Sequence, residues 1–394
     1  MIPLEEALRR LDAAVSDRRL PAEKVSLEQA RGRFLASDVA SRLDLPPFDK
    51  SAVDGYALLE GDYNRKHYQL LETVAAGRPG KAELKPGTTV KVMTGAPLPA
   101  GTGRVLMLED TDEQGVSVEV RKPPKDANLC RRGEDVQAGQ VIFTKGQRLG
   151  PLEIANLVGC GVTEVETVTK PRLFVISTGD EIVDRPEDLQ PGKIMNSNGP
   201  LLAGLAQKHG LAVLGCVSVP DDPAELERVL ASAVREADIV ILSGGVSAGE
   251  YDFVPEVIQR LGLTIHFSRL AVKPGKPTTF ATGPEAILFG LPGNPVAVYL
   301  MFHLMVLRVI ANLSGAPAAE LRFSAPLARE FRRASTVRKE YVPARITPDG
   351  AVERVEYHGS AHLTALMQAD GFFEVPLGVG EIKAGARVPF FLLG

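Results

Sequence analysis

The sequence predicts a multidomain protein of α/β and β-rich parts, in which residues 171–316 form a doubly wound α/β domain. Two observations support this prediction. Within that region, short apolar runs typical of buried parallel strands alternate with segments of helical periodicity. On both sides of it, β-type runs are separated by Gly and Pro. The chain of 394 residues has room for roughly two to four domains of about 100–200 residues each.

The composition is that of an ordinary soluble protein, with 44% hydrophobic and 24% charged residues. The formal net charge of −4 does not indicate a general surface for nucleic acid or for an acidic membrane. The three cysteines are odd in number and far apart, which favours neither a disulfide framework nor a thiolate metal site. A reducing, cytoplasmic compartment is therefore expected.

Neither a secretion signal nor a membrane span is expected. The N-terminus carries Glu5 and Glu6 where a secretion signal would have basic residues and an apolar run. The most apolar segment, residues 296–307, contains His303 and is closed by Arg308. It falls short of the ~20 residues that a membrane-spanning helix needs, so we expect a core helix there.

The first part of the chain is predicted to contain a helix, a connector with one short helix, a small β-rich unit and a second helix. The helices are indicated by apolar residues at helical spacing, and the β-rich unit by short β-type runs between Gly and Pro. Its start is marked by two consecutive prolines. In chain order, these parts are expected at residues 3–16, 25–44, 46–138 and 151–160, with β-type runs at 88–93 and 116–120.

The α/β domain is predicted from five strands and four helices that follow one another along the chain. The strands are expected at residues 173–176, 212–214, 239–242, 263–267 and 286–289. The helices are expected at residues 201–209, 223–236, 254–261 and 295–313. From residue 317 the pattern returns to short β runs, at 340–345 and 371–375, which predict a compact β domain of roughly 80 residues.

A Gly-rich turn, Ser243–Asp252, follows the most apolar predicted strand and precedes a predicted helix. Its three glycines in six residues let the backbone turn tightly and approach a ligand. Such a turn offers backbone N–H groups to an anion. An ordinary connection between strand and helix explains the same glycines, and spacing alone does not decide between the two interpretations.

Three acids follow predicted strands and are expected at one edge of the sheet: Glu181, Asp221 and Asp252. Carboxylates suit Mg²⁺, especially when the ion is shared with a substrate phosphate. Asp221 or its neighbour Asp222 can instead cap the following helix, as can Asp252, and Glu181 can be a solvated loop acid. Together with the Gly-rich turn and a second one at Gly290–Pro295, the three acids favour a binding site.

A basic loop, Arg269–Pro277, follows another predicted strand. Prolines on both sides of Gly275 restrict its backbone, so Lys273 and Lys276 can present two ammonium groups to an oxyanion. Solvated surface lysines are the alternative. In the β-rich unit, Asp54-Gly55, Thr94-Gly95 and Arg131-Arg132 mark turns, and the arginine pair can also hold a phosphate.

Seven motifs, which occur in order over nearly the whole chain, resemble those of the molybdopterin molybdenumtransferase family, and the C-terminal part of gephyrin is similar. One such motif is weakly specific, whereas seven in order are highly specific. The motifs are Asp49–Ala57, Met93–Ala96, Arg132–Asp135, Ser177–Glu181, Ser243–Ser247, Lys273–Pro277 and Gly290–Pro295.

The resemblance implies an extended connector domain built from two chain segments, an inserted β-rich domain, a molybdopterin-binding α/β domain and a C-terminal β-barrel. It also implies a homodimer in which the partner completes the active cleft. The segments are expected at residues 1–45 for the N-terminal helix and connector, 46–138 for the insertion, 139–170 for the returning connector, 171–316 for the α/β domain and 317–394 for the barrel.

The implied reaction inserts molybdenum from molybdate into adenylylated molybdopterin and releases AMP, with Mg²⁺ as the metal and an adenylyltransferase as a possible handover partner. By motif, Asp221 and Asp252 would serve the metal and the hydrolysis, and Glu181 would support the site. Asp54 and Thr94 would reach the cleft from the other subunit. The substrate-binding residues would be Lys273, Lys276, Arg269, Arg338, Ser360, Ser243, Gly244, Gly245, Ser247, Gly293 and Asn294.

Two positions depart from the family pattern. Ala297 stands where the family often has Ser, and Pro343 where it often has Arg, which leaves Arg345 as a candidate substitute. Both departures concern the molybdate site more than the reaction. Two alternatives remain: a molybdopterin adenylyltransferase, which leaves the Asp54 and Thr94 motifs unexplained, and a molybdopterin-binding scaffold without transfer activity, against which the acids and lysines count.

Overall fold

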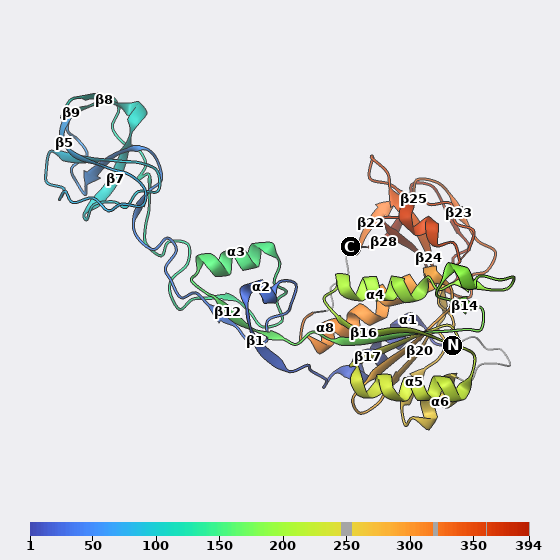
Figure 1. Ribbon diagram of the computed structural model, residues 1–394. Helices are drawn as coiled ribbons and strands as arrows, with labels where there is room; N and C mark the ends of the chain where they lie inside the picture. Colours follow the sequence, from blue (N-terminus) through green and yellow to red (C-terminus); the bar gives the residue numbers. More distant parts are fainter. Residues whose placement is uncertain (246–253, 318–321, 360, 394) are drawn as a thin grey trace. The chain divides into compact units, whose positions relative to one another are not determined.

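The structure is a computed structural model that describes residues 1–245, 254–317, 322–359 and 361–393. The chain forms two compact units (Figure 1). The first contains residues 1–23, 32–36 and 167–394, and the second contains residues 24–31 and 37–166. Strands β1 (Ala22–Ser26) and β12 (Glu164–Val168) contain points at which the chain passes from one unit to the other.

The second unit contains the predicted small β-rich part and the connector helices. Its main sheet has the strand order β7-β4-β6-β5-β9-β8, and most of its pairings are antiparallel. The bounds are β4 (Gly55–Leu59), β5 (His67–Val74), β6 (Thr88–Val92), β7 (Thr102–Met107), β8 (Thr111–Gln114) and β9 (Ser117–Val120). The remaining elements are α2 (Leu27–Ala30), β2 (Val39–Ala40), β3 (Lys50–Ser51), η1 (Leu108–Asp110), β10 (Leu129–Cys130), β11 (Val141–Phe143) and α3 (Pro151–Gly159).

A six-stranded sheet with the order β16-β13-β17-β21-β20-β18 forms the centre of the first unit. The pairs β13/β16, β13/β17 and β17/β21 are parallel, as predicted, whereas β20 pairs antiparallel with both neighbours. The bounds are β13 (Arg172–Thr178), β16 (Ala212–Val219), β17 (Ile239–Ser243), β18 (Thr264–Phe267), β20 (Thr279–Thr282) and β21 (Ile287–Leu291). Strand β17 is buried at every position, which explains its continuous apolar run.

Helices cover both faces of this sheet, which confirms the doubly wound α/β prediction (Figure 1). Side chains of α1, α4, α7 and α8 form one core with the sheet, and side chains of α5 and α6 form the other. The bounds are α1 (Leu4–Val15), α4 (Asn198–Lys208), α5 (Pro223–Glu236), α6 (Val254–Arg260), α7 (Pro295–Met301), a π-helical segment η3 (Phe302–Val306) and α8 (Leu307–Leu313).

The predicted helix at residues 295–313 is continuous in the structure as α7, η3 and α8. By length and composition it is apolar enough to cross a membrane, but 72% of its most apolar window is buried inside the protein. Its side chains pack with those of α1 and α4 in the core of the first unit. This burial confirms the predicted core helix.

The C-terminal part of the first unit is built on a six-stranded sheet with the order β19-β24-β26-β28-β22 and β25 beside β24. Its two end strands are not paired with each other among the described residues, so a closed barrel is not confirmed. The bounds are β19 (Val272–Lys273), β22 (Arg322–Pro326), β24 (Lys339–Ile346), β25 (Val352–Arg354), β26 (Gly371–Val375) and β28 (Arg387–Leu392). Shorter elements are β14 (Ile182–Val183), η2 (Pro186–Asp188), β15 (Ile194–Met195), β23 (Phe331–Arg332), η4 (Leu363–Gln368) and β27 (Glu381–Ile382).

The two sheets of the first unit are joined by a shared core. Tyr341, Phe372 and Phe391 of the C-terminal sheet are buried in the same cluster as α1, α7 and α8. The alternate residues Val342 and Phe373 point into a separate core on the other face. In addition, β19, which lies in the predicted basic loop, pairs with β24 of the C-terminal sheet. The basic loop is therefore held by both parts of this unit.

Candidate functional site

The register of the parallel strands places their carboxyl ends at one edge of the sheet. Thr178 pairs with Val219, Ser177 with Ser243, and Ser243 with Leu291. The loops that follow β13, β16, β17 and β21 therefore leave the sheet side by side. These loops carry Glu181, Asp221, the Gly-rich turn and the second Gly turn, so the structure brings the predicted loops together, as expected for an open α/β sheet.

Gly244 and Gly245 begin the Gly-rich turn and adopt positive φ angles of 95° and 62°. A Cβ on Gly244 would lie 2.2 Å from the carbonyl oxygen of Thr178, so only glycine fits this close approach. The remainder of the turn, including Ser247 and Asp252, lies outside the described residues.

Asn198, at the start of α4, connects the two Gly turns. Its side-chain amide donates hydrogen bonds to the Ser243 hydroxyl, at 2.8 Å, and to the Gly293 carbonyl, at 2.7 Å. Ser243 and Asn198 are buried, whereas Gly293 and Asn294 are exposed. Asn198 therefore connects the buried end of β17 to the second Gly turn, where Gly293 and Asn294 are exposed. Because its partners are distant in sequence, the motif spacing did not reveal this role.

Asn196 fixes the neighbouring strand ends in a similar way. Its amide donates to Asp184 at 2.9 Å and to Ser218 at 3.0 Å. Its side-chain oxygen accepts hydrogen bonds from the Ser177 hydroxyl and from the backbone N–H of Gly199. All four hydrogen-bonding positions of this amide are thus used. This residue, too, was not predicted from the sequence.

Two neighbouring acids after β16 have different roles in the structure. The Asp222 carboxylate accepts hydrogen bonds from the backbone N–H groups of Ala224, at 2.8 Å, and Glu225, at 3.1 Å, so Asp222 is the N-cap of α5. Asp221 does not cap the helix. Its Oδ2 lies 3.4 Å from the backbone nitrogen of Asp180, and the Asp180 carboxylate accepts from the Asp221 backbone N–H at 3.1 Å.

Asp180 is a site candidate that the prediction passed over in favour of its neighbour Glu181. Glu181 is exposed, and a Cβ on Gly179 would lie 2.4 Å from its carboxylate, so the side chain folds over Gly179. The described residues contain no group of three or more His, Cys, Asp or Glu side chains arranged to hold a metal ion. The carboxylates of Asp180 and Asp221 each contact the backbone N–H of the other residue, and one or two protein carboxylates are enough for a Mg²⁺ ion that also binds substrate phosphates.

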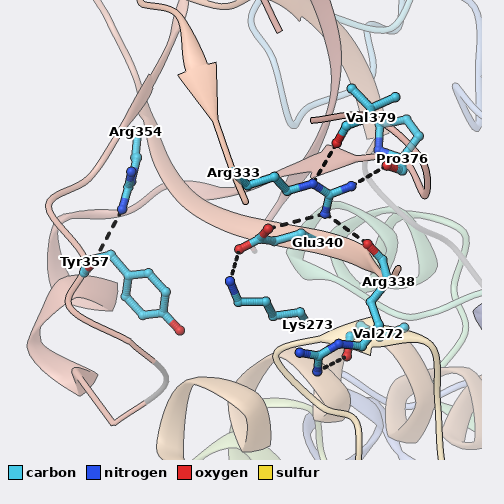
Figure 2. Close-up of polar contacts among 9 residues, drawn as sticks. All are labelled: Val272, Lys273, Arg333, Arg338, Glu340, Arg354, Tyr357, Pro376 and Val379. Atoms are coloured by element: carbon cyan, nitrogen blue, oxygen red, sulfur yellow. Dashed lines mark hydrogen bonds and ion pairs between the residues drawn. The ribbon is translucent and has the colours of Figure 1, made fainter. Parts of the chain in front are cut away.

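The predicted cations of the basic loop lie where β19 pairs with β24 (Figure 2). The Lys273 ammonium is 2.8 Å from Oε1 of Glu340, and Arg338 donates to the Val272 carbonyl at 3.4 Å. Lys276 and Arg269 are exposed in the same loop. The predicted cations Lys273 and Arg338 thus come together from two parts of the first unit. Ser360, predicted for the same set, lies outside the described residues.

Two further residues were not predicted: Glu340, which contacts Lys273, and Tyr357, whose hydroxyl is affected by the charge of Glu340 (Figure 2). Glu340 is buried between Lys273 and Arg333. Burial, and to a lesser extent the Glu340 carboxylate, raises the pKa of Tyr357 to about 12. The Tyr357 hydroxyl therefore stays neutral and protonated at physiological pH and can act as a hydrogen-bond donor. Glu340, in a predicted β run, and Tyr357, in a connecting segment, carry no sequence signal of such an environment.

The two departures from the family pattern have structural counterparts. Ala297 is buried in α7, so this position offers no hydroxyl to a ligand. Pro343 is a buried residue of β24, where it pairs with Phe372 of β26. Arg345 forms an ion pair with Glu353 of β25 at 2.7 Å. The structure gives Arg345 a partner within its own hairpin and shows no contact between it and Lys273.

Asp54 and Thr94, predicted together, are in direct contact in the second unit. Oδ1 of Asp54 accepts hydrogen bonds from the backbone N–H of Thr94, at 2.6 Å, and from its hydroxyl, at 2.8 Å. These bonds, the backbone one first, lower the pKa of Asp54 below its usual value. Both residues are exposed. The carboxylate is therefore held ionised and in a fixed orientation at the surface.

The variant Thr94→Val is expected to raise the pKa of Asp54 partway towards the ordinary value of about 3.9, because it removes the hydroxyl donor and keeps the backbone N–H. Since the folded-state pKa is depressed, the bond stabilises the protein above the unfolded-state pKa, and this stabilisation is lost as the pH falls through the folded-state value. A carboxyl-carbon NMR titration of Asp54 checks the shift. An identical Asp54 pKa in both proteins would contradict it.

Three family models match successive parts of the chain. Residues 2–161 match the "MoeA N-terminal region (domain I and II)". Residues 174–312 match the "Probable molybdopterin binding domain", and residues 324–393 match the "MoeA C-terminal region (domain IV)". The three matches follow one another in the order that the sequence motifs predict.

Comparisons with whole proteins cover almost the entire chain. The molybdopterin molybdenumtransferase of Staphylococcus aureus strain Mu50 is 34% identical over 402 residues, covering 99% of this chain and 95% of the relative. The Staphylococcus epidermidis relative of the same name, from strain ATCC 12228, is also 34% identical, over 93% of this chain and 90% of its own length. The crystal structure of the molybdopterin biosynthesis moeA protein from Pyrococcus horikoshii OT3 matches all of both chains with a TM-score of 0.86 and 30% identity. This protein therefore belongs to the molybdopterin molybdenumtransferase family.

Proposed function

We propose that this protein inserts molybdenum from molybdate into adenylylated molybdopterin and releases AMP. The names of the curated relatives support this activity. The observation that carries it in this chain is the pairing of two kinds of anion site in one unit. Gly turns and acids lie at the carboxyl edge of the sheet, and Lys273 and Arg338 lie where the basic loop joins the C-terminal sheet.

The first group suits the phosphate-bearing pterin substrate. The backbone N–H groups of a Gly turn at the start of a helix can bind phosphate oxygens, and Gly244 lets the start of this turn pack closely against the carboxyl end of β13. Asp221 is not engaged in capping, so its carboxylate can orient the water that cleaves the phosphoanhydride bond. Ser243, which is buried, and Gly245, Gly293 and Asn294 are proposed to bind the same substrate, and Glu181 is proposed to support the site.

The second group suits molybdate. Lys273, Lys276 and Arg338, with Arg269 in the same loop, supply several positive charges to a dianion, and charge-assisted hydrogen bonds to oxyanions are strong. Ser360 is proposed to add a hydroxyl. The neutral Tyr357 hydroxyl adds a donor that carries no charge.

Mg²⁺ is proposed as the metal, held by Asp221 with Asp180 and with Asp252. When bound, it would neutralise charge on the substrate phosphates. The protein's residues would orient the ion and the water around it. Asp54 and Thr94, which fix each other at the surface of the second unit, are proposed to serve the cleft of a partner subunit.

A homodimer is proposed from the family resemblance. The exposed apolar residues Leu152 and Val158 of α3, 82% and 61% exposed, support a covered surface in the second unit. A cytoplasmic location and substrate handover from an adenylyltransferase are proposed on the same basis. The domain limits at residues 46–138, 171–316 and 317–394 also belong to this proposal, together with a C-terminal barrel.

The test is AMP release from adenylylated molybdopterin by the purified protein with Mg²⁺, with and without molybdate. We expect release that depends on molybdate and on Mg²⁺. Tight pterin binding without AMP release would favour the scaffold, and formation of adenylylated molybdopterin from ATP would favour the adenylyltransferase. Either result would overturn the proposed reaction.

A further inference from the structure

Lys273 is anchored by a buried carboxylate. Lys273 and Glu340 are direct partners in the parallel pairing of β19 with β24. The Lys273 side chain is 50% exposed, whereas the Glu340 side chain is only 10% exposed. A half-exposed lysine side chain is thus paired with a largely buried carboxylate, and Figure 2 shows this ion pair.

Glu340 is itself held by Arg333. The Arg333 side chain is 5% exposed, and its Nη1 lies 3.3 Å from Oε2 of Glu340, the oxygen that does not contact Lys273. The guanidinium also donates to three backbone carbonyls, those of Arg338, Pro376 and Val379. Because Arg333 is fixed on several sides, the carboxylate that it holds cannot turn freely, and each carboxylate oxygen has one cationic partner.

We propose that Glu340 is a positioning residue that directs the Lys273 ammonium at the oxyanion substrate; this rests on the proposed function of the site. A lysine side chain is flexible and donates three hydrogen bonds. One goes to Glu340, and two remain for the ligand. The carboxylate reduces the positive charge at the site, but Arg338 and Lys276 leave a surplus for a dianion. We therefore expect the ordering of Lys273 to have a larger effect on binding of the dianion than the negative charge of Glu340.

Glu340 orders Lys273 and also places a negative charge near the anion. These two roles predict opposite changes in the KM for molybdate when Glu340 is replaced by Gln. If ordering dominates, the variant raises the KM for molybdate about tenfold and changes kcat by less than about twofold. If the negative charge only weakens anion binding, the KM falls. Glu340→Asp keeps the charge but withdraws the carboxylate by one methylene, so positioning predicts a raised KM in this variant too. If Glu340 acts through its charge alone, the KM of Glu340→Asp equals that of the unmodified protein.

Glu374→Gln is the matched control. Glu374 is a buried carboxylate of the same sheet that also pairs with two cations, Arg322 and Lys339, but it has no contact with Lys273. The control is expected to leave the KM for molybdate unchanged. Thermal melting of each variant shows whether it is folded. If Glu340→Gln does not fold, the KM of Glu340→Asp decides the test.

The Lys273→Met background tests whether Glu340 acts through Lys273. We expect Lys273→Met to raise the KM and Glu340→Gln to add less than about twofold in that background. If Lys273→Met raises the KM while Glu340→Gln and Glu340→Asp leave it unchanged or lower it, the positioning role is wrong. Full additivity of the two substitutions also overturns it. Absence of molybdate-dependent AMP release from the unmodified protein would instead overturn the proposed function, and the inference with it.

Discussion

Asp221→Ala is expected to lower the rate of AMP release by about a hundredfold or more and to leave the melting temperature nearly unchanged. The first effect follows from a proposed role in orienting water and Mg²⁺ at the phosphoanhydride, where loss of a catalytic acid or base typically costs about 10²–10⁴-fold. The second follows from the structure, in which the carboxylate caps no helix and its contact with the described residues is a long one, 3.4 Å from the Asp180 nitrogen.

Asp222→Ala is the matched control for this prediction. The neighbouring carboxylate caps α5 through two backbone N–H groups, so its removal is expected to cost about 1 kcal/mol of stability. AMP release by the control should stay within about twofold of the unmodified rate at a temperature where the protein is folded. Single-turnover release and melting curves separate the two variants. If Asp221→Ala retains activity, or if Asp222→Ala loses as much, the assignment of the catalytic acid is wrong.

This pair of acids also shows where sequence reasoning succeeds and where it ends. The apolar run of β17 and the helical periodicity of α5 are local properties, and both elements were predicted close to their observed bounds. Which of two adjacent acids caps the helix depends on the path of the chain after β16. Pro223 at the first position of the predicted helix was a signal for Asp222 as the N-cap that the prediction did not use, and the structure decides between the two acids.

Elements and contacts with weak local signals were missed. Strand β20 contains two threonines among four residues and lies between Pro277 and Gly283, so it looked like part of a loop. Its omission also hid the antiparallel edge of the sheet. The contacts of Asn198 with Ser243 and Gly293, and of Glu340 with Lys273, join residues distant in sequence. Motif spacing carries no information on such contacts, whereas the shared edge of parallel strands was predictable from topology.

The second large expected effect is a loss of stability on substitution of Gly244, at the start of the Gly-rich turn. Gly244→Ala is expected to destabilise the first unit by about 3–5 kcal/mol, among the largest costs of a single substitution. Two causes add. A φ of 95° is unfavourable for any residue with a Cβ, and that Cβ would lie 2.2 Å from the Thr178 carbonyl oxygen on the adjacent strand. The strand end or the turn must shift, which would also disturb the proposed phosphate site.

Gly262→Ala separates these two causes. Gly262 also has a positive φ, 73°, but nothing lies within 4 Å of the position that its Cβ would take. Only the cost of the positive φ remains in Gly262→Ala, so we expect a loss of about 1 kcal/mol in the free energy of unfolding. Urea denaturation followed by circular dichroism compares the two variants. Equal losses would mean that Thr178 and the turn can move apart easily, and a turn that yields so readily could not hold phosphate oxygens in a fixed array of N–H groups.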